Sequence, residues 1–232
     1  VSVKDIKTTI ATTDAILSYT EYDGSSDQKL LYTFNMNSGV KWISGWQNTY
    51  LAASVASSTV FNYGTSQFLD NSTTLKGKVT SPVSTSIVRS FTKYDGSADQ
   101  QLSYTWNFID PTTYQADPNL YAASNVASST IFNYAGLYLK TSVSLSGKKT
   151  GAAVTDVIQS YTDYDGSSDQ KLKYTFNMKS GVLYRAGFVN TYTATEVNTS
   201  TIFDYGVGQY LLHSVSVKDI KTTIATTDAI LS

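Results

Sequence analysis

The chain has 232 residues, with 17 basic and 18 acidic side chains and a formal net charge of −1 at pH 7. These charges are scattered along the chain, which disfavours nucleic acid or an anionic membrane surface as a partner. The lack of cysteine excludes disulfides, thiolate metal sites and cysteine nucleophiles, and no run approaches the roughly 20 apolar residues that membrane insertion needs.

The composition predicts an all-β protein. Only 15% of the residues are charged, whereas tyrosine alone occurs 18 times. Serine, threonine and asparagine are also abundant, and this balance suits polar strand faces and loops better than the Glu/Lys/Ala-rich surface of a helical protein.

The first predicted elements in chain order are a strand at Val1–Thr8 and a hairpin. Ile16–Tyr22 is rich in β-branched and aromatic residues, and the following Asp-Gly-Ser-Ser-Asp segment has the residues that reverse a chain. Leu30, Tyr32 and Phe34 then alternate with more polar positions, which predicts a half-buried strand.

Two further strands are predicted in the same stretch. Val40–Trp46 is expected to be one, and Val55–Tyr63 is expected to be another because it is rich in Thr, Val, Phe and Tyr. The segment Ala-Ala-Ser-Val-Ala-Ser offers one or two helical turns at most.

The sequence then repeats itself. Tyr-Asp-Gly recurs at Tyr22, Tyr94 and Tyr164, each time within a longer shared phrase. A second phrase, which ends in Phe-Asn-Tyr or Phe-Asp-Tyr, also occurs three times. Both phrases recur with a period of about 71 residues, which is the signature of a tandem-repeat architecture.

We therefore expect three tandem units, at 1–72, 73–142 and 143–214, each with about five short strands in a sandwich or barrel. Because a unit of about 71 residues buries a marginal core, strands are expected to be shared across unit boundaries.

Residues 215–232 copy residues 1–18 without a change, and the copy begins three periods after the original. This segment is interpreted as the first strand of a further unit, in a chain where a block of three units is itself repeated. The alternatives are a strand duplicated by design, to close a ring or permute the chain, and a segment that stands in for a neighbour's strand.

Catalysis is not expected. His213 is the only histidine, has no counterpart in the other units and is expected to be a surface residue at a strand end. Paired aspartates do occur, but three like sites on turns of one chain are more typical of structure than of an acid–base pair.

The acidic loops carry a calcium hypothesis, because clustered carboxylates are the ligands that this ion prefers. Unit two has Lys93 where unit three has an aspartate, and a lysine would repel a cation. Turn formation by aspartate side chains is the alternative. The candidate ligands are Asp23, Asp27, Asp95, Asp99, Asp163, Asp165 and Asp169.

Aromatic residues carry a glycan-binding hypothesis, because exposed rings form platforms for sugars. The candidates are Trp42 and Trp46 in unit one and Tyr184 and Phe188 in unit three, whereas unit two breaks the pattern with two Asp-Pro pairs. Most other recurring aromatics are expected in the core. Asn71 and Asn198 begin N-glycosylation patterns in turn-rich surroundings.

The sequence thus predicts a structural, self-assembling protein that is extracellular or on the cell surface, as a fibre, a surface layer or an adhesin stalk. Its expected partners are other copies of itself or neighbouring repeat units. The alternative is a carbohydrate-binding repeat module, which calcium at the acidic loops would assist, and an artificially closed threefold protein is a third interpretation. No cofactor is expected otherwise.

Overall fold

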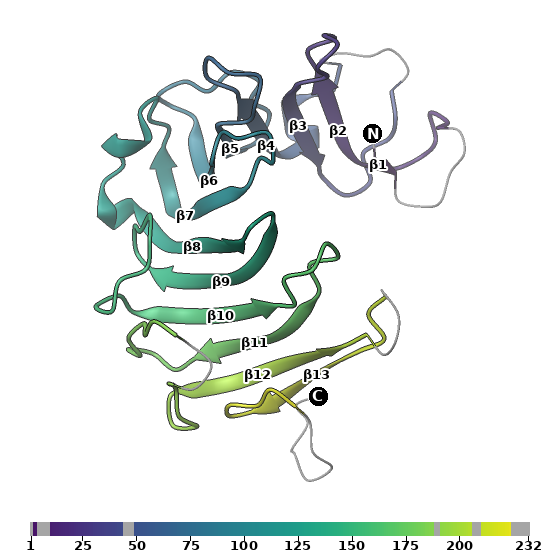
Figure 1. The fold of residues 1–232 in the computed structure, drawn as a ribbon. Helices are drawn as coiled ribbons and strands as arrows, with labels where there is room; N and C mark the ends of the chain where they lie inside the picture. Colours follow the sequence, from purple (N-terminus) through teal and green to yellow (C-terminus); the bar gives the residue numbers. More distant parts are fainter. Residues whose placement is uncertain (1, 4–9, 44–48, 188–190, 206–209, 224–232) are drawn as a thin grey trace. The chain divides into compact units, whose positions relative to one another are not determined.

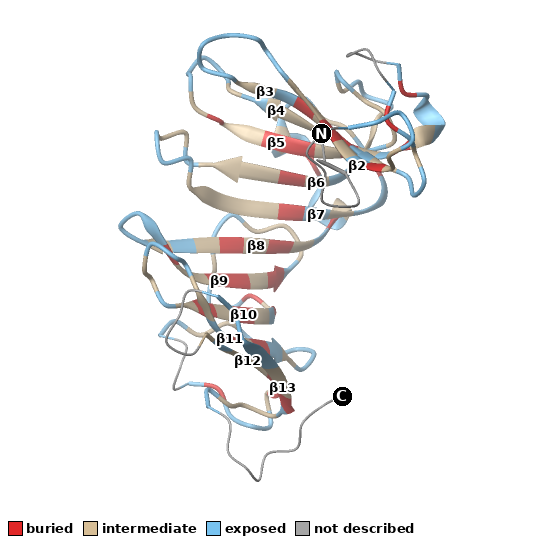
Figure 2. Cartoon of the chain, turned by 90° about the vertical axis from the view of Figure 1, so that its right-hand side faces the viewer, coloured by how far each residue is buried: buried red, intermediate tan, exposed pale blue. Residues whose placement is uncertain are grey.

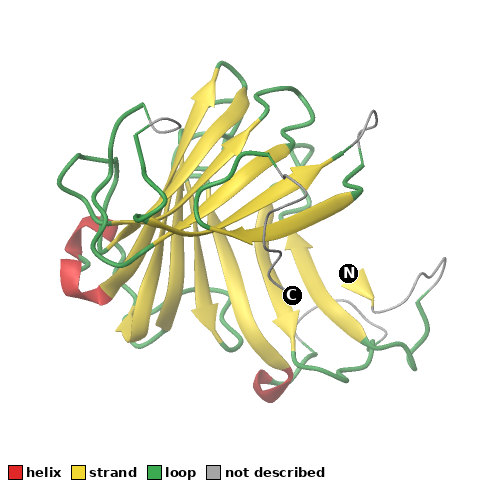
Figure 3. Cartoon of the chain, turned by 90° about the horizontal axis from the view of Figure 1, so that it is seen from below, coloured by secondary structure: helices red, strands yellow, loops and turns green. Residues whose placement is uncertain are grey.

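The computed structural model describes residues 2–3, 10–43, 49–187, 191–205 and 210–223. In these ranges the chain is all-β, as predicted, with short 3-10 turns as its only helices (Figure 3). The described strands are β1 (Ser2–Val3), β2 (Ile16–Tyr22), β3 (Leu30–Met36), β4 (Val55–Asn62), β5 (Asn71–Lys76), β6 (Ile87–Tyr94), β7 (Leu102–Thr113), β8 (Val126–Ala135), β9 (Tyr138–Ser146), β10 (Ile158–Tyr164), β11 (Leu172–Met178), β12 (Val197–Asp204) and β13 (His213–Lys218).

The strands follow one another in the sheet in the same order as in the chain, from β1 to β13 (Figure 1). The strand order is linear and does not close on itself. A separate sandwich or barrel in each repeat unit is therefore not confirmed. Because each strand pairs with its successor, the chain continues the sheet where the sequence suggested a boundary.

By compactness the chain divides into two units. One comprises residues 1–100 and 107–125, and the other comprises 101–106 and 126–232. Strand β7 contributes residues to both. Each unit has its own buried cluster: Phe34 lies in the first with Tyr19, Trp42 and Tyr50, and Phe176 lies in the second with Tyr161 and Tyr174. Buried positions recur along the strands that form these clusters (Figure 2).

The predicted hairpin is confirmed. Strands β2 and β3 pair antiparallel, with Tyr19 opposite Phe34 and Thr20 opposite Thr33. Tyr32 and Phe34 are buried, whereas the intervening Thr33 is half-buried and the neighbouring Leu31 is exposed. The period of two in the sequence therefore corresponds to the two faces of the strand. Of the strand predicted at Val1–Thr8, Ser2–Val3 forms β1 and the rest lies outside the described residues.

The strand predicted at Val40–Trp46 is not formed in its described part, residues 40–43. Lys41 makes only an isolated bridge with Ala15, and Trp42 N–H donates to the Asp14 carbonyl at 2.8 Å. Residue 39 is a glycine at φ +81°, so the chain turns there instead of extending the hairpin. The predicted short helix is a 3-10 turn at Ala52–Ser54, directly before β4. In the described residues, the strands recur with a period of four, from β5 to β8 and from β9 to β12, where about five were predicted for each unit.

Strands β5, β9 and β13 carry the same part of the repeat and pair with the preceding strand in the same register. Thr59 lies opposite Thr74, Thr130 opposite Ser144, and Thr201 opposite Ser216. These pairings cross the sequence boundaries near 72, 142 and 214. The copied segment contributes residues 215–218 to β13, which pairs with β12. Strand sharing between repeat units stays a prediction.

A buried serine fixes the segment that follows each of these three strands. The Ser58 hydroxyl donates to the Gly77 carbonyl and accepts from Val79 N–H, at 2.7 and 2.8 Å. Ser129 makes the same pair with Gly147 and Lys149, and Ser200 with Asp219 and Lys221. All three serines are fully buried. The hydroxyl is the group best suited here, because it donates and accepts at once.

Replacing Asp219 with glycine is expected to stabilise the protein by about 1 kcal/mol, because a left-handed backbone strains a residue that has a Cβ. Asp219 has φ +62°, and the equivalent positions are Gly77 at +72° and Gly147 at +74°. Urea denaturation of Asp219→Gly measures the gain. The reverse change, Gly147→Asp, is a matched control expected to lose a similar amount, since a Cβ there would meet nothing within 4 Å. Equal stability of both variants and the parent would refute the backbone explanation.

Candidate functional site

The Asp-Gly loops are organised by their own aspartates. Asp23 accepts from Ser25 N–H at 3.0 Å and from Lys29 N–H at 3.1 Å, and Asp165 accepts from Ser167 and Lys171 N–H at the same distances. Asp95 accepts from Ser97 N–H at 3.0 Å. Hydrogen bonds from Ser25 lower the pKa of the Asp23 carboxyl, and at Asp165 desolvation opposes the lowering of the pKa but hydrogen bonds outweigh it. These are Asx turns, the alternative weighed against calcium.

The other loop aspartates are engaged differently. Asp27 contacts the Ser26 hydroxyl at 3.4 Å, and Asp169 lies 3.7 Å from the Lys171 ammonium. The backbone N–H groups of Asp99 and Asp169 each donate to a serine hydroxyl at 3.3 Å. In the described ranges no group of three or more acidic, histidine or cysteine side chains is placed to hold a metal ion. Calcium binding therefore stays a prediction, without a ligand cluster in this part of the chain.

Asp163 differs from the other candidates because it is buried. It lies in β10, where its carboxylate is 3.1 Å from the Lys173 ammonium and accepts from the Tyr161 hydroxyl at 3.4 Å. Glu21 is its counterpart in β2 and accepts from the Tyr19 hydroxyl. In β6 the counterpart is Lys93, which pairs with Asp70. Where the repeat has lysine instead of an acidic residue, the side chain pairs with an aspartate instead of a tyrosine hydroxyl.

Asp163, Asp165 and Tyr184 line one open pocket of about 880 Å³ in the second compact unit. The pocket lies over β9 to β12 and is also lined by the rings of Tyr161, Tyr174 and Tyr205 and by Lys171 and Lys173. Aromatic faces beside a carboxylate and ammonium groups can bind a small polyhydroxylated ligand: the rings contact C–H faces and the charged groups contact hydroxyls.

The two tyrosines next to Asp163 resist ionisation. Burial, reinforced by the Asp163 carboxylate, raises the pKa of Tyr161 strongly and that of Tyr174 to about 12. A phenol that stays neutral can donate a hydrogen bond, as Tyr161 does to Asp163.

Stability is expected to fall as pH rises through the alkaline range. An unfolded tyrosine ionises near pH 10, whereas folded Tyr174 ionises near 12, so its contribution is complete below pH 10 and is lost between about pH 10 and 12. The loss for this one residue approaches about 2 kcal/mol. Urea midpoints at pH 8, 10 and 11 measure it, and Tyr174→Phe should flatten the decline. An unchanged slope in that variant would contradict the assignment.

The aromatic candidates of the two repeats are placed differently. Trp42 is buried in the first unit's core with Tyr19, Phe34 and Tyr50, so its ring is not an exposed platform. Tyr184 is half-buried and lines the pocket. Trp46 and Phe188 lie outside the described residues. The sequence alignment of Trp42 with Tyr184 thus pairs a core residue with a pocket residue.

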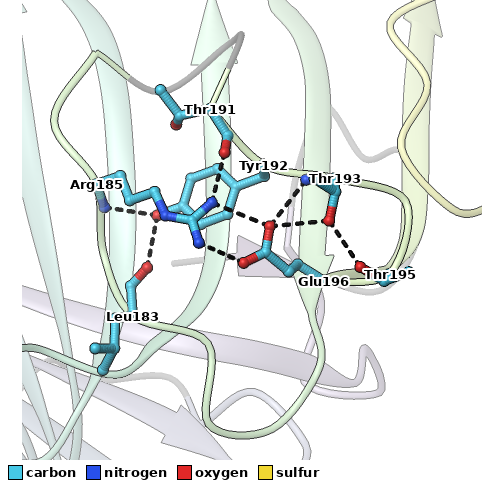
Figure 4. Close-up of polar contacts among 7 residues, drawn as sticks. All are labelled: Leu183, Arg185, Thr191, Tyr192, Thr193, Thr195 and Glu196. Carbon is cyan, nitrogen blue, oxygen red and sulfur yellow. Dashed lines mark hydrogen bonds and ion pairs between the residues drawn. The ribbon is translucent and has the colours of Figure 1, made fainter.

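A polar cluster between β11 and β12 was not anticipated from the sequence (Figure 4). The Arg185 guanidinium binds both oxygens of Glu196, at 3.0 and 2.5 Å, and Glu196 also accepts from Thr193 N–H at 2.9 Å. The Tyr192 hydroxyl accepts from Arg185 N–H at 2.7 Å and donates to the Leu183 carbonyl at 3.1 Å. The cluster shapes the loop that carries Tyr184.

The tyrosine of this cluster recurs in the other repeats. Tyr50 accepts from Ile43 N–H at 3.3 Å, and Tyr121 accepts from Gln115 N–H at 3.0 Å. All three tyrosines are buried. The signal available in the sequence was the shared Asn-x-Tyr at the start of the second phrase, which indicated a strand flank but not a hydrogen bond to a loop.

The remaining candidates lie on strands. Asn71 begins β5 and donates to Asp70 at 2.8 Å, whereas Asn198 is exposed as the second residue of β12. Turn residues lie close before each of them, at 64–68 and 194–196, and each asparagine is the first or second residue of its strand. Glycosylation at either asparagine stays a prediction. His213 is exposed at the start of β13, 3.7 Å from Asp204, as its surface prediction required.

No protein-family model and no curated protein sequence matches this chain. Within the described residues, no helix has the length and apolarity that crossing a membrane would take.

Proposed function

We propose that this is a non-catalytic structural protein, a tandem array of β-units that extends one sheet and forms a fibre, a surface layer or an adhesin stalk outside the cell or on its surface. Each repeat unit would supply four strands and share its first strand with the unit before. Its partners would be neighbouring units or further copies of the chain.

One observation carries this proposal. The repeated strand pairs with its predecessor in one register at β4–β5, β8–β9 and β12–β13. Strands β5 and β9 also pair with the strands that follow them, β6 and β10. A unit boundary therefore contains the same continuous ladder as the interior of a unit. A design in which every unit completes its neighbour favours serial extension over a discrete globular product.

Electron microscopy of the purified chain and of native material tests the proposal. We expect filaments or ordered sheets whose axial repeat corresponds to one unit or to three. Dispersed particles that never assemble, across protein concentration and ionic strength, would count against a structural array.

A glycan-binding module is the second candidate, and the tyrosine-lined pocket favours it. If it is correct, Tyr184→Ala should weaken binding to a glycan found by array screening by about tenfold or more, as loss of a stacking ring removes more than about 1.4 kcal/mol. Tyr22→Ala, at an exposed tyrosine outside the pocket, is the matched control. Repeating the screen with a chelator tests the calcium hypothesis. An array without binders would reject this function.

A further inference from the structure

The C-terminal strand β13 resembles β5 and β9 in sequence position but differs from them in burial. Leu69 lies just before β5 and Leu139 is the second residue of β9, and they are 5% and 8% exposed. The equivalent Leu211 is 48% exposed. Ser72 and Ser142 are buried, and the equivalent Ser214 is exposed. Within the described residues, β5 and β9 are followed in the sheet by β6 and β10, whereas β13 is the last strand.

From these differences we propose that the outer edge of β13 binds β2 of a second copy of this chain, in place of that copy's own β1. This inference deepens the proposed self-assembly and rests on it. It names the contacting strands, their register and the occupant of the edge.

The register follows from three pairings that already agree. Thr74 lies opposite Ser90, Ser144 opposite Ser160, and Ser2 opposite Ser18. Ser216 is the equivalent of Thr74 and Ser144, and it is also the copy of Ser2. The three pairings agree on one register, and in the proposed complex this register places Ser216 opposite Ser18 of the second copy.

The exchange extends the pairing of β2. Strand β1 pairs with β2 at two positions, Ser2 with Ser18 and Val3 with Ile16. Strands β5 and β6, and likewise β9 and β10, pair at five. The segment copied from residues 1–18 is preceded by His213 and Ser214, so β13 also reaches Thr20 and Glu21. Ser216 and Val217 repeat Ser2 and Val3, so the exchange keeps the two residue types that β1 pairs with β2.

The added positions are chemically complementary. In the same register His213 stands opposite Glu21, which places an imidazole N–H donor beside a carboxylate. The corresponding position between β5 and β6 holds Lys93, paired with Asp70. An edge strand with an identical segment available to exchange is a common origin of domain-swapped assembly.

Cysteine cross-linking tests the pairing, since the chain has no cysteine of its own. Chains carrying Ser18→Cys are mixed with chains carrying Ser216→Cys, oxidised, and analysed without reductant. In the control, chains carrying Ser214→Cys are used instead of chains carrying Ser216→Cys. Ser214 is two residues from Ser216 in β13 and lies on the same face of the strand. Opposed Cβ atoms are close enough for a disulfide and diagonal ones are not. We expect at least about tenfold more linked two-chain product with Ser216→Cys, although Ser214 is the more exposed residue.

The outcomes separate this inference from the proposed function. Equal yields from the two mixtures would overturn the register, and filaments without the specific cross-link would overturn the inference but leave the structural function in place. A specific cross-link in discrete oligomers would support the pairing and reject the filament. If the double variant Ser18→Cys/Ser216→Cys links within single chains at high dilution, the occupant is the chain's own β2, and the second copy is wrong.

Discussion

Trp106→Ala should lower the free energy of unfolding by about 3–5 kcal/mol, the usual cost of removing a buried large aromatic side chain. The indole is 1% exposed, lies 4.9 Å from the Tyr104 ring between centroids and has the Lys148 ammonium 4.6 Å from its own centroid. Its Nε1–H donates to the Lys149 carbonyl at 2.7 Å. Alanine would leave a cavity and remove the donor from that half-buried carbonyl. Urea denaturation with fluorescence and circular dichroism measures the change.

The matched control is Trp106→Phe, because Phe34 and Phe176 occupy the equivalent positions of the other repeats and are fully buried. This variant keeps most of the packing and loses the hydrogen bond, so a cost of about 1–2 kcal/mol is expected. If the two variants lower the free energy of unfolding by the same amount, packing of the aromatic ring does not account for the stability that Trp106 contributes. A loss below about 1 kcal/mol for alanine would show that the site relaxes around the cavity.

The strands that the sequence predicted best are those with a local signal. Tyr32 and Phe34 alternate with polar residues beside an Asp-Gly loop, and this pattern determines both the hairpin and its buried face. The regular recurrence of the two phrases likewise predicted that the same elements recur. The spacing of the repeated phrases does not determine whether each unit forms its own sandwich or barrel or whether all units continue one sheet. The same alternating strands are compatible with both.

The pocket and the loop contacts depended on tertiary structure. Trp42 and Tyr184 align in the repeats, yet Trp42 packs in the buried cluster of the first unit and Tyr184 lines a pocket. The hydrogen bonds of Tyr192 and Glu196 join residues separated by several positions in an irregular loop, for which no periodicity exists. Sequence reasoning therefore identified the residue types of the candidate site but not their grouping.

The copied segment links the fold to the proposed assembly, because in that assembly it would both extend the sheet of its own chain and offer an edge to the next chain. Among the contacts of its described residues are these three: the ladder between β12 and β13, the burial of Val217, which is 1% exposed, and the Ser200 hydroxyl between Asp219 and Lys221. An assembly strand that detached from its own chain would be of little use in extending the sheet. The strength of these contacts is therefore a condition for the proposed role.

Ending the chain at Ser214 should accordingly destabilise it by on the order of 2.5–6 kcal/mol, the sum of two losses. Loss of the buried Val217 side chain accounts for about 1.5–3 kcal/mol, and the unsatisfied Ser200 hydroxyl for about 1–3 kcal/mol. A chain ending at Thr223 is the control, because it keeps all three contacts. Urea denaturation of both chains gives the difference, and hydrogen exchange should place the lost protection in β12. If both chains are equally stable, the copied segment does not complete the sheet, and its role at the edge would have to be independent of folding.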